Sequence, residues 1–414
     1  MLRRAAVRAT QRRYRPGGPV SLPQRGNTPP LENARRVVHN TAGPPELSLA
    51  WRLNLEIKIV RSLTAIGAAA ILLSALLPDA LLTSPAAAAK PPKVTVETAL
   101  DGLHNPCGVA VQPGTGHVFV SDSGAGRIVR ITGSGSEAVI ADFPADAYGK
   151  GTYEEQTKFD IGPLGLAFLD KNTLVVGGGG NTDGAELVRI YNVPAAGTSI
   201  RAKDMKHSLG PIPTGDASEK GEGNFYGIAA TDNAIYVTCN GDDTKGWISR
   251  IDLKNGAPGK LEPFIKTKTA TEIDAPVGIT TDATGHLVIG QMGEITVAND
   301  SLLTFYDAAS GDALMNLKTG LHDIASLAYS PQSGRLYAVD FAWGERSADG
   351  GVFRLDSKLV GGKQTIEAVK VAKLDKPAAI AFAPDGTMYV AIFGSPQQGS
   401  DKKPGKLIRI SGEL

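Results

Sequence analysis

A pattern of short apolar strands separated by turns repeats six times between residue 105 and residue 414. The clearest copy has a small apolar strand at 105–111, a Pro-Gly-Thr-Gly turn, a second strand at 117–122 and a third at 127–131. Gly, Pro and Asp punctuate the chain between segments that are too short for helices. The later copies recur about every 50 to 60 residues and begin at Pro163, Phe225, Pro276, Ile324 and Pro377. A period of this length indicates an array of similar units.

Each complete copy continues into a fourth, outer strand, as at 137–143, 261–266 and 365–374. Four antiparallel strands per unit make one blade of a β-propeller. The sixth copy has no fourth strand after 406–410, whereas an unpaired strand at 94–100 precedes the first copy. We therefore predict an all-β fold over residues 94–414, a six-bladed β-propeller with four-stranded blades whose ring is closed by the N-terminal strand of the domain. A β-sandwich would not need the sixfold period, and no residues remain for a seventh blade.

The composition supports this fold and excludes one class of function. The chain has 49 Gly and 26 Pro but only 6% aromatic residues, which suits many short strands joined by turns. Residues 90–414 carry 31 Lys and Arg against 38 Asp and Glu. Because this balance offers no basic surface for a phosphate backbone, we expect no nucleic-acid partner. We also expect a monomer.

The N-terminal 89 residues differ in composition from the repeats. Residues 1–57 are basic and hold several Pro and Gly, and we expect them to be disordered or to result from a misplaced start in the gene model. In 58–89, a basic flank precedes an apolar run, 66–82, and four alanines follow at 86–89. These features describe a signal peptide for export to the periplasm or the extracellular space. The alternatives are an uncleaved membrane anchor through residues 63–82 and an organellar presequence.

Polar residues recur where the second strand of a blade ends and where the chain leads into the first strand. In a four-stranded blade both loops open on the same face, around the central channel. The first and fifth copies match, because Gly-Leu-His-Asn at 102–105 precedes Asp122 and Gly-Leu-His-Asp at 320–323 precedes Asp340, 18 residues after the histidine in both. Carboxylates and imidazoles on one mouth suit a divalent cation or a general base. The alternative is that these residues cap backbone groups of the turns.

The candidate residues follow from this alignment of the copies. The predicted ligand-binding residues are Asp122, Asn224, Asp323, Asp340 and Trp343. The predicted metal ligands are His104, His322 and Asp274, together with Asp122 and Asp340. Trp343 follows Asp340 in a long loop, where it forms an apolar lid over the mouth or packs against a neighbour. Cys107 and Cys239 form either one disulfide or two buried thiols, and their spacing matches no metal motif.

The copies resemble the NHL-repeat and senescence-marker/gluconolactonase-like propellers, and the nearest stretch is Ala-Pro-Asp-Gly-Thr-Met-Tyr-Val at 383–390. The resemblance covers about 320 residues. It implies a Ca²⁺ or Zn²⁺ held over the channel by a Glu, two Asn-type ligands and an Asp at the end of a second strand, a position that Asp122 and Asp340 match. The chain departs from the family pattern where Ala-Ser-Leu stands at 325–327, and no Glu-Gly-Pro-x-Trp segment opens the first blade.

The phrase Leu-x-x-Pro-x-Gly-Val-Ala at 103–110 is also similar to the blades of pyrroloquinoline-quinone sugar dehydrogenases, but their characteristic His-x-Gly-Gly is absent. The functional hypothesis is therefore an exported β-propeller that binds a small molecule or a protein partner on its channel face. The alternative is a divalent-metal-dependent lactone or ester hydrolase of the gluconolactonase-like type. The sequence leaves open whether the protein is an enzyme.

Overall fold

The computed structural model describes residues 89–133, 135–148, 159–242, 244–273, 275–395 and 403–414. The predicted extension at 1–57, the predicted signal or anchor segment up to residue 88 and the candidate ligand Asp274 lie outside the described residues. Residues Ser84–Leu414 belong to one compact unit. No helix among the described residues is long and apolar enough to cross a membrane.

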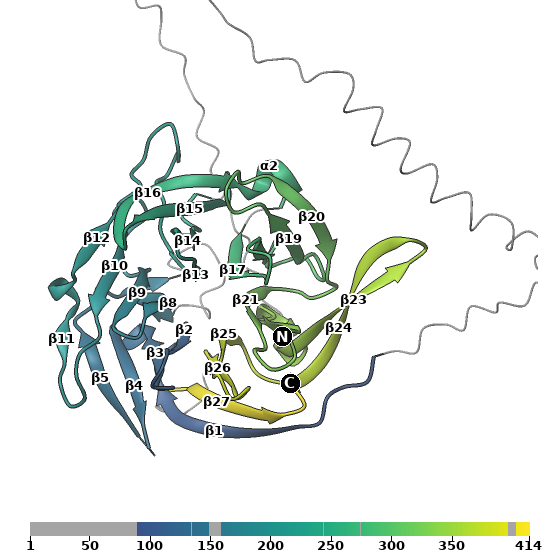
Figure 1. The fold of residues 1–414 in the computed structure, drawn as a ribbon, viewed down its shortest axis with the longest axis horizontal. Helices are drawn as coiled ribbons and strands as arrows, with labels where there is room; N and C mark the ends of the chain where they lie inside the picture. The colour runs from purple at the N-terminus through teal and green to yellow at the C-terminus, as the bar shows by residue number, and fades with distance from the viewer. Residues whose placement is uncertain (1–88, 134, 149–158, 243, 274, 396–402) are drawn as a thin grey trace, which may run out of the picture. The chain divides into compact units, whose positions relative to one another are not determined.

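Six antiparallel sheets stand in a ring, which confirms the predicted six-bladed β-propeller (Figure 1). Blade 1 consists of β2 (Gly108–Val111), β3 (Val118–Asp122), β4 (Arg127–Thr132) and β5 (Gly135–Ala141), with the short β11 (Ile200–Arg201) parallel to β5. Blade 2 consists of β8 (Pro163–Asp170), β9 (Thr173–Gly178), β10 (Val188–Asn192) and β12 (His207–Leu209). Blade 3 consists of β13 (Ile228–Ala230), β14 (Ala234–Thr238), β15 (Trp247–Lys254) and β16 (Ala257–Lys266).

The remaining blades follow the same order from the channel outwards. Blade 4 consists of β17 (Pro276–Thr281), β18 (Leu287–Gln291), β19 (Leu302–Tyr306) and β20 (Ala313–Lys318). Blade 5 consists of β21 (Ile324–Tyr329), β22 (Leu336–Asp340), β23 (Gly351–Val360) and β24 (Lys363–Lys373). Blade 6 consists of β25 (Pro377–Phe382), β26 (Met388–Ile392), β27 (Gly405–Gly412) and β1 (Val94–Leu103).

Strand β1 closes the ring as the sequence predicts, because it supplies the outer strand that the sixth repeat lacks. It pairs with β27 in antiparallel register from Val94 opposite Gly412 to Leu103 opposite Gly405. Leu103 is 2% exposed and packs in a cluster with Val109 of blade 1 and Ala391 of blade 6. The closure strand therefore pairs with the backbone N–H and C=O groups on the outer edge of β27. Its side chains also fill the space between blades 1 and 6.

Apolar residues between neighbouring blades form the rest of the core. The second strand of each blade is buried along nearly its whole length, since it is covered on both faces by the adjacent blades. Cys107 and Cys239 are buried free thiols, so of the two sequence alternatives the buried thiols are confirmed.

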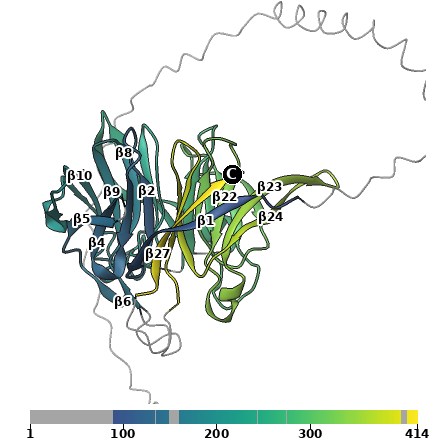
Figure 2. The ribbon, with the colours of Figure 1, turned by 90° about the horizontal axis from the view of Figure 1, so that it is seen from below.

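Two short elements that the repeat pattern did not predict lie between blades 1 and 2. Strands β6 (Asp146–Tyr148) and β7 (Phe159–Ile161) pair in antiparallel register. In the side view they lie at the face of the disc opposite the C-terminus (Figure 2). This face carries the loops from second to third strands and the leads into first strands, and it is called the loop face below.

Truncating the closure strand's last apolar side chain tests its contribution. We expect Leu103→Ala to lower the free energy of unfolding by about 2–5 kcal/mol, because the lost contacts leave a cavity between blades 1 and 6. Leu359→Ala makes the same chemical change at a side chain that is 79% exposed, and should change stability by less than about 0.5 kcal/mol. Urea unfolding followed by circular dichroism measures both; equal effects of the two substitutions would contradict the role of β1.

Candidate functional site

Asp122 and Asp340 hold the backbone of the loop face in the same way in blades 1 and 5. Asp122 accepts a hydrogen bond from the His104 backbone N–H at 2.6 Å, and its second oxygen pairs with Arg127 at 2.7 Å. Asp340 accepts from the backbone N–H groups of His322 at 3.0 Å and Asp323 at 2.8 Å. The matching spacing in the sequence is therefore a repeated backbone clamp, the capping role that the sequence analysis held as the alternative.

A residue in the segment that leads into the first strand adopts a left-handed conformation in four blades. Asn105, Asn224, Ala275 and Lys376 all have a positive φ, between 47° and 50°. Asparagine tolerates this left-handed conformation better than most side chains, which explains why it stands at two of the four positions. The left-handed turn thus accounts for an asparagine at position 224. Asn224 lies in blade 3, whereas the carboxylates of Asp323 and Asp340 belong to blade 5.

His104 and Asn105 position the β6–β7 hairpin on the loop face. The Asn105 side-chain amide donates to the Asp160 carbonyl at 2.8 Å, and His104 Nε2 lies 3.4 Å from the Asp160 carboxylate. Burial lowers the pKa of His104, as does the nearby Lys403 ammonium, while the Asp160 charge opposes them. The lowered pKa disfavours the charged form of the His104 imidazole beside the hairpin.

The hairpin delivers Phe159 into an aromatic cluster that closes the loop-face end of the channel. Phe159 stacks on Trp343 with ring centroids 5.8 Å apart and meets Phe393 edge-on at 4.9 Å. Phe341 contacts both Trp343 and Phe393. Trp343 is thus packed between neighbours, one of the two alternatives from the sequence. Contacts of this geometry add to the apolar area that the rings bury.

Tyr226 spans the channel beneath this aromatic cluster. Its hydroxyl donates to the Ala378 carbonyl at 3.1 Å, which joins blade 3 to blade 6 across the ring. One apolar cluster contains buried side chains of blades 1, 2, 4, 5 and 6, with Tyr226 of blade 3 packed against it. All six blades therefore contribute side chains to this cluster, and Tyr226 bridges the channel from blade 3 to blade 6.

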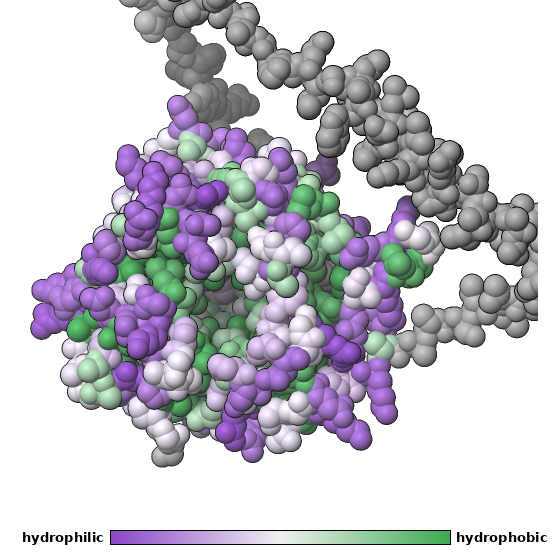
Figure 3. All heavy atoms as spheres, viewed as in Figure 1, coloured by the Kyte–Doolittle hydropathy of each residue, from purple (hydrophilic) through white to green (hydrophobic). Residues whose placement is uncertain are grey.

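The rest of the channel is a cavity of about 310 Å³. It is lined by the first strands of all six blades, mostly through small or apolar side chains such as Ala110, Ala229, Ala325 and Ala379. A hollow rimmed by hydrophobic residues is visible at the centre of the ring (Figure 3). The polar side chains of its lining are the Cys107 thiol, the Tyr226 phenol and the hydroxyl groups of Thr280, Thr281 and Ser326, with no carboxylate or imidazole among them. This cavity is therefore poorly equipped for acid–base chemistry.

The titratable groups gather instead beside the aromatic cluster, between blades 4 and 5. We call Asp300, His322, Asp323, Trp343 and Arg346 the blade 4–5 polar cluster. Asp323 accepts from the Trp343 backbone N–H at 2.8 Å and lies 3.9 Å from the Arg346 guanidinium. His322 Nδ1 accepts from the Asn299 backbone N–H at 3.2 Å, and Asp300 accepts from that of Glu294 at 2.9 Å. Arg346 also donates to the Ile295 carbonyl, which ties the two loops together.

Four polar atoms of this cluster are buried and have no hydrogen-bond partner among the described residues. They are Asp300 Oδ1, Asp323 Oδ1, Trp343 Nε1 and Arg346 Nε. Buried polar atoms in native proteins are nearly always paired, so a group of them indicates a partner such as water or a ligand. Two of the atoms accept and two donate, which gives the cluster mixed hydrogen-bonding character.

Burial raises the pKa of Asp323 to about 7, and the nearby charges of Asp340 and Asp300 act in the same direction. The Trp343 backbone N–H and the Arg346 guanidinium oppose the shift. Asp323 is 0% exposed. A carboxyl group that titrates near neutral pH beside a guanidinium can exchange a proton with a bound molecule and stabilise a developing negative charge.

The described residues do not form the predicted metal site. No group of three or more His, Cys, Asp and Glu side chains among them could hold a metal ion. The carboxylate oxygens of Asp122 and Asp340 already accept hydrogen bonds from backbone N–H groups and, for Asp122, from a guanidinium. The two residues belong to blades 1 and 5, which are not neighbours in the ring. The calcium or zinc ion that the resemblance implies therefore does not fit these residues, and no step is derived through it.

Three predicted residues come together in the polar cluster, and two members of the cluster were not predicted. His322, Asp323 and Trp343 lie together, whereas Asp300 and Arg346 were missed. Both missed residues lie in the loops from second to third strand, at 292–301 in blade 4 and 341–350 in blade 5. No signal in the repeat marks these two residues, because the loops from second to third strand differ in length from blade to blade and lie outside the aligned strands.

Comparison with known proteins supports the fold. No protein-family model matches the chain, and no curated protein matches it. Among solved structures, a putative oxidoreductase (glucose dehydrogenase) from Thermus thermophilus matches at a TM-score of 0.52 and 17% identity, over 77% of this chain and 100% of that one. The pyrroloquinoline-quinone-bound aldose sugar dehydrogenase of Streptomyces coelicolor matches at 0.50 and 15%, over 78% and 100%.

A gluconolactonase from Xanthomonas campestris matches at a TM-score of 0.48 and 14% identity, over 78% of this chain and 95% of that one. The neighbours are thus six-bladed propellers of the sugar dehydrogenase and gluconolactonase-like kinds, and no family model supports the NHL-repeat name. At these identities the likeness shows the fold, and the activity has to be argued from the site.

A second buried carboxyl group, Glu222 in blade 3, allows a test of the electrostatics away from the polar cluster. Glu222 is 0% exposed, its Oε1 has no partner among the described residues, and burial raises its pKa to about 7. A carboxyl with a raised pKa favours the folded state fully below the pKa of an unfolded glutamate. That contribution is lost as the pH rises through 7.

We therefore expect wild-type protein to lose about 3 kcal/mol of free energy of unfolding between pH 4 and pH 8 relative to Glu222→Gln. The amide stays neutral at every pH, so the difference in stability between the two proteins should change by this amount between pH 4 and pH 8. Urea unfolding at several pH values measures this, with Glu219→Gln as a control at an exposed position of the same loop. A constant difference between wild type and Glu222→Gln would contradict the raised pKa.

Proposed function

We propose that this protein binds a small polyhydroxylated compound, such as a sugar or a sugar lactone, in the blade 4–5 polar cluster. The observation that carries the proposal is the group of four unpaired buried polar atoms, from Asp300, Asp323, Trp343 and Arg346. A hydroxyl group both donates and accepts hydrogen bonds. Vicinal hydroxyls therefore suit a site in which carboxylate oxygens accept beside a guanidinium and an indole that donate.

Other classes of ligand fit these residues less well. A cation would be repelled by the Arg346 guanidinium, and an anion by Asp300 and Asp323. A protein partner would need an exposed surface, whereas Asp323 is fully buried. The names of the Thermus and Streptomyces neighbours describe enzymes that act on sugars, which supports the same class of ligand here.

Access to Asp323 requires the loop above it to move. The short helix η3 (Gly344–Ala348) follows Trp343, and its first residue, Gly344, has a positive φ of 62°. The space beside its Cα, where a Cβ would lie, is open to a distance of 4 Å. This glycine offers a hinge at the start of η3. The export predicted from the sequence would place this binding activity outside the cytoplasm.

Binding is tested by isothermal titration calorimetry with D-glucose, D-gluconate and D-glucono-1,5-lactone. We expect at least one of these compounds to bind wild type and to bind Asp323→Asn about tenfold more weakly, since the amide replaces one acceptor by a donor. Glu222→Gln is the matched control, because it neutralises another buried carboxyl with a pKa near 7. Absence of binding to wild type, or equal weakening by both substitutions, would contradict the proposal.

A second candidate function is hydrolysis of a lactone or ester at the same cluster, without a metal ion. The pKa of Asp323, about 7, favours it, because a base that titrates near neutral pH is effective there. Asp323 would take a proton from water as the water oxygen bonds to the carbonyl carbon, and Arg346 would stabilise the resulting oxyanion. The acyl C–O bond then breaks, and the proton passes from Asp323 to the leaving alkoxide.

The rate of lactone opening should rise with pH through an apparent pKa near 7, and Asp323→Asn should lower it by about a hundredfold or more. A chelator such as EDTA should leave the rate unchanged. Titration of the released acid with a pH indicator measures both, after subtraction of spontaneous opening. An activity that EDTA abolishes would overturn this mechanism and restore the metal-dependent alternative.

A further inference from the structure

The hairpin of β23 and β24 projects from the edge of the disc (Figure 1). Strand β22 pairs with β23 only as far as Leu355, whereas β23 and β24 pair with each other up to Val360 opposite Lys363. The outer part of the hairpin is therefore a two-stranded ribbon, and no third strand among the described residues pairs with it. Such a ribbon contributes little to the core of a propeller.

The tip of this ribbon exposes two adjacent large apolar side chains. Leu359 is 79% exposed and Val360 is 62% exposed, the highest values among the exposed large hydrophobic residues that the structure describes. Gly361 and Gly362 follow them and make the turn with positive φ values of 57° and 77°. Apolar side chains kept in water at a projecting tip indicate a surface that is covered when the protein functions.

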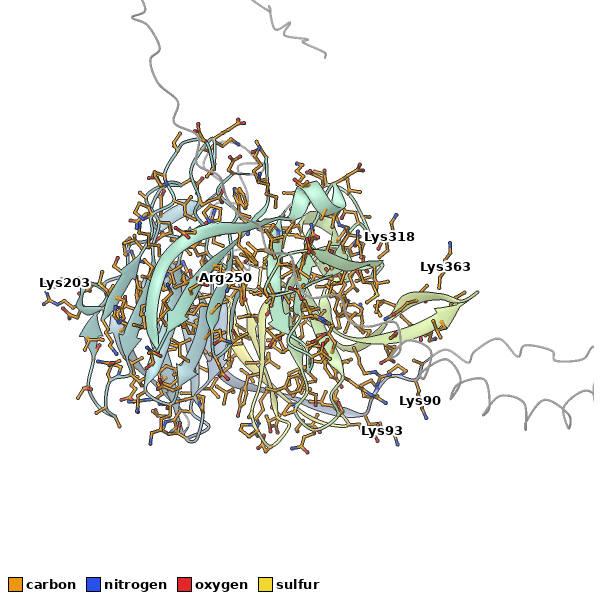
Figure 4. The ribbon with its side chains drawn as sticks, turned by 45° about the horizontal axis from the view of Figure 1, so that its top comes forward. Lys90, Lys93, Lys203, Arg250, Lys318 and Lys363 are labelled. Atoms are coloured by element: carbon orange, nitrogen blue, oxygen red, sulfur yellow. The ribbon has the colours of Figure 1, made fainter. Side chains whose placement is uncertain are left out.

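Basic residues surround the apolar tip. The segment 351–373 carries five basic residues and two acidic ones, a net charge of +3 in a domain that is otherwise acidic. Lys363 follows the tip directly, and Lys358 precedes it and pairs with Glu367. Lys90, Lys93, Lys318 and Lys363 all lie on the same side of the propeller, opposite Lys203 (Figure 4). An apolar tip flanked by lysines matches an anionic lipid surface in both polarity and charge.

The N-terminal end of the described chain lies beside the same hairpin. The Ala89 backbone N–H lies 3.3 Å from both carboxylate oxygens of Glu367 on β24. In the sequence the apolar run 66–82 ends only seven residues before Ala89. Seven extended residues span about 25 Å at most, so a lipid surface that held this run would lie within about that distance of the hairpin.

We propose that the β23–β24 hairpin docks on an anionic membrane, with Leu359 and Val360 inserted among the headgroups and the neighbouring lysines on the lipid phosphates. The insertion of two apolar side chains alone gives weak, reversible binding, and the electrostatic attraction provides the second signal that stable attachment requires. The proposal does not depend on the proposed sugar site, which lies at the loop face.

The test uses the full chain with Val360→Cys, labelled with a dye whose emission shifts to the blue in an apolar environment. Cys107 and Cys239 are buried, so the new thiol is labelled selectively. Vesicles of equal parts phosphatidylglycerol and phosphatidylcholine should shift the emission, and phosphatidylcholine alone should not. Adding Lys358→Gln and Lys363→Gln should raise the lipid concentration for half-maximal shift by about tenfold, as should high salt.

Lys203→Cys, labelled in the same way on the opposite edge of the disc, is the matched control and should show no shift. The same shift at both positions would mean that the vesicles bind through another part of the chain, which overturns the proposal. A shift that depends on protein concentration without vesicles would assign the tip to a second copy of the chain instead. No shift at position 360 with anionic vesicles would also overturn it.

Discussion

The hydrogen bond from the Tyr226 hydroxyl to the Ala378 carbonyl, with the aromatic cluster above it, is the contact on which the arrangement of the site depends. It joins opposite blades of the ring, and buried side chains of the other four pack around it. A propeller is otherwise held by contacts between neighbouring blades, which leave its axis open. Here the Tyr226 side chain crosses from blade 3 to blade 6 and packs with the aromatic cluster, so apolar rings lie between the polar groups of opposite blades.

The polar groups that are free to bind a ligand therefore lie on one side of the ring, between blades 4 and 5. Asp122 and Asp340 stand at equivalent positions in blades 1 and 5, yet each is occupied with the backbone of its own blade. Four of the unpaired buried atoms belong to the blade 4–5 polar cluster, where the loops 292–301 and 341–350 of adjacent blades meet beside Trp343. The same tryptophan therefore belongs to the closed axis and to the polar cluster. Movement at η3 would change both, which couples access to Asp323 with the packing of the aromatic rings.

The sequence predicted the parts of the structure that follow from local pattern. The six copies, their order and the closure by β1 depend on apolar periodicity and on one missing strand, and the structure confirms them. The pairing of Asp122 with the backbone of His104, and of Asp340 with that of His322, follows from a spacing of 18 residues within one blade. Capping of backbone groups was the alternative interpretation of these turn residues, and the structure shows it.

The parts that were not predicted depend on contacts between different blades. Asp300 and Arg346 lie inside loops from second to third strand, whose lengths differ between the copies, so aligning the strand ends could not relate them. Phe159 lies in the β6–β7 hairpin outside the repeat, and nothing in its sequence shows that it reaches Trp343. The metal prediction assigned Asp122 and Asp340 to one ion, whereas each carboxylate accepts hydrogen bonds from backbone or guanidinium donors of its own blade.

The most direct test of this account is a crystal structure of the protein saturated with the tightest-binding sugar or lactone. The account predicts electron density for the ligand between blades 4 and 5, within hydrogen-bonding distance of Asp323 and Arg346, with Tyr226 still bonded to Ala378. Density for the ligand on the axis of the ring, with Tyr226 displaced from blade 6, would contradict it.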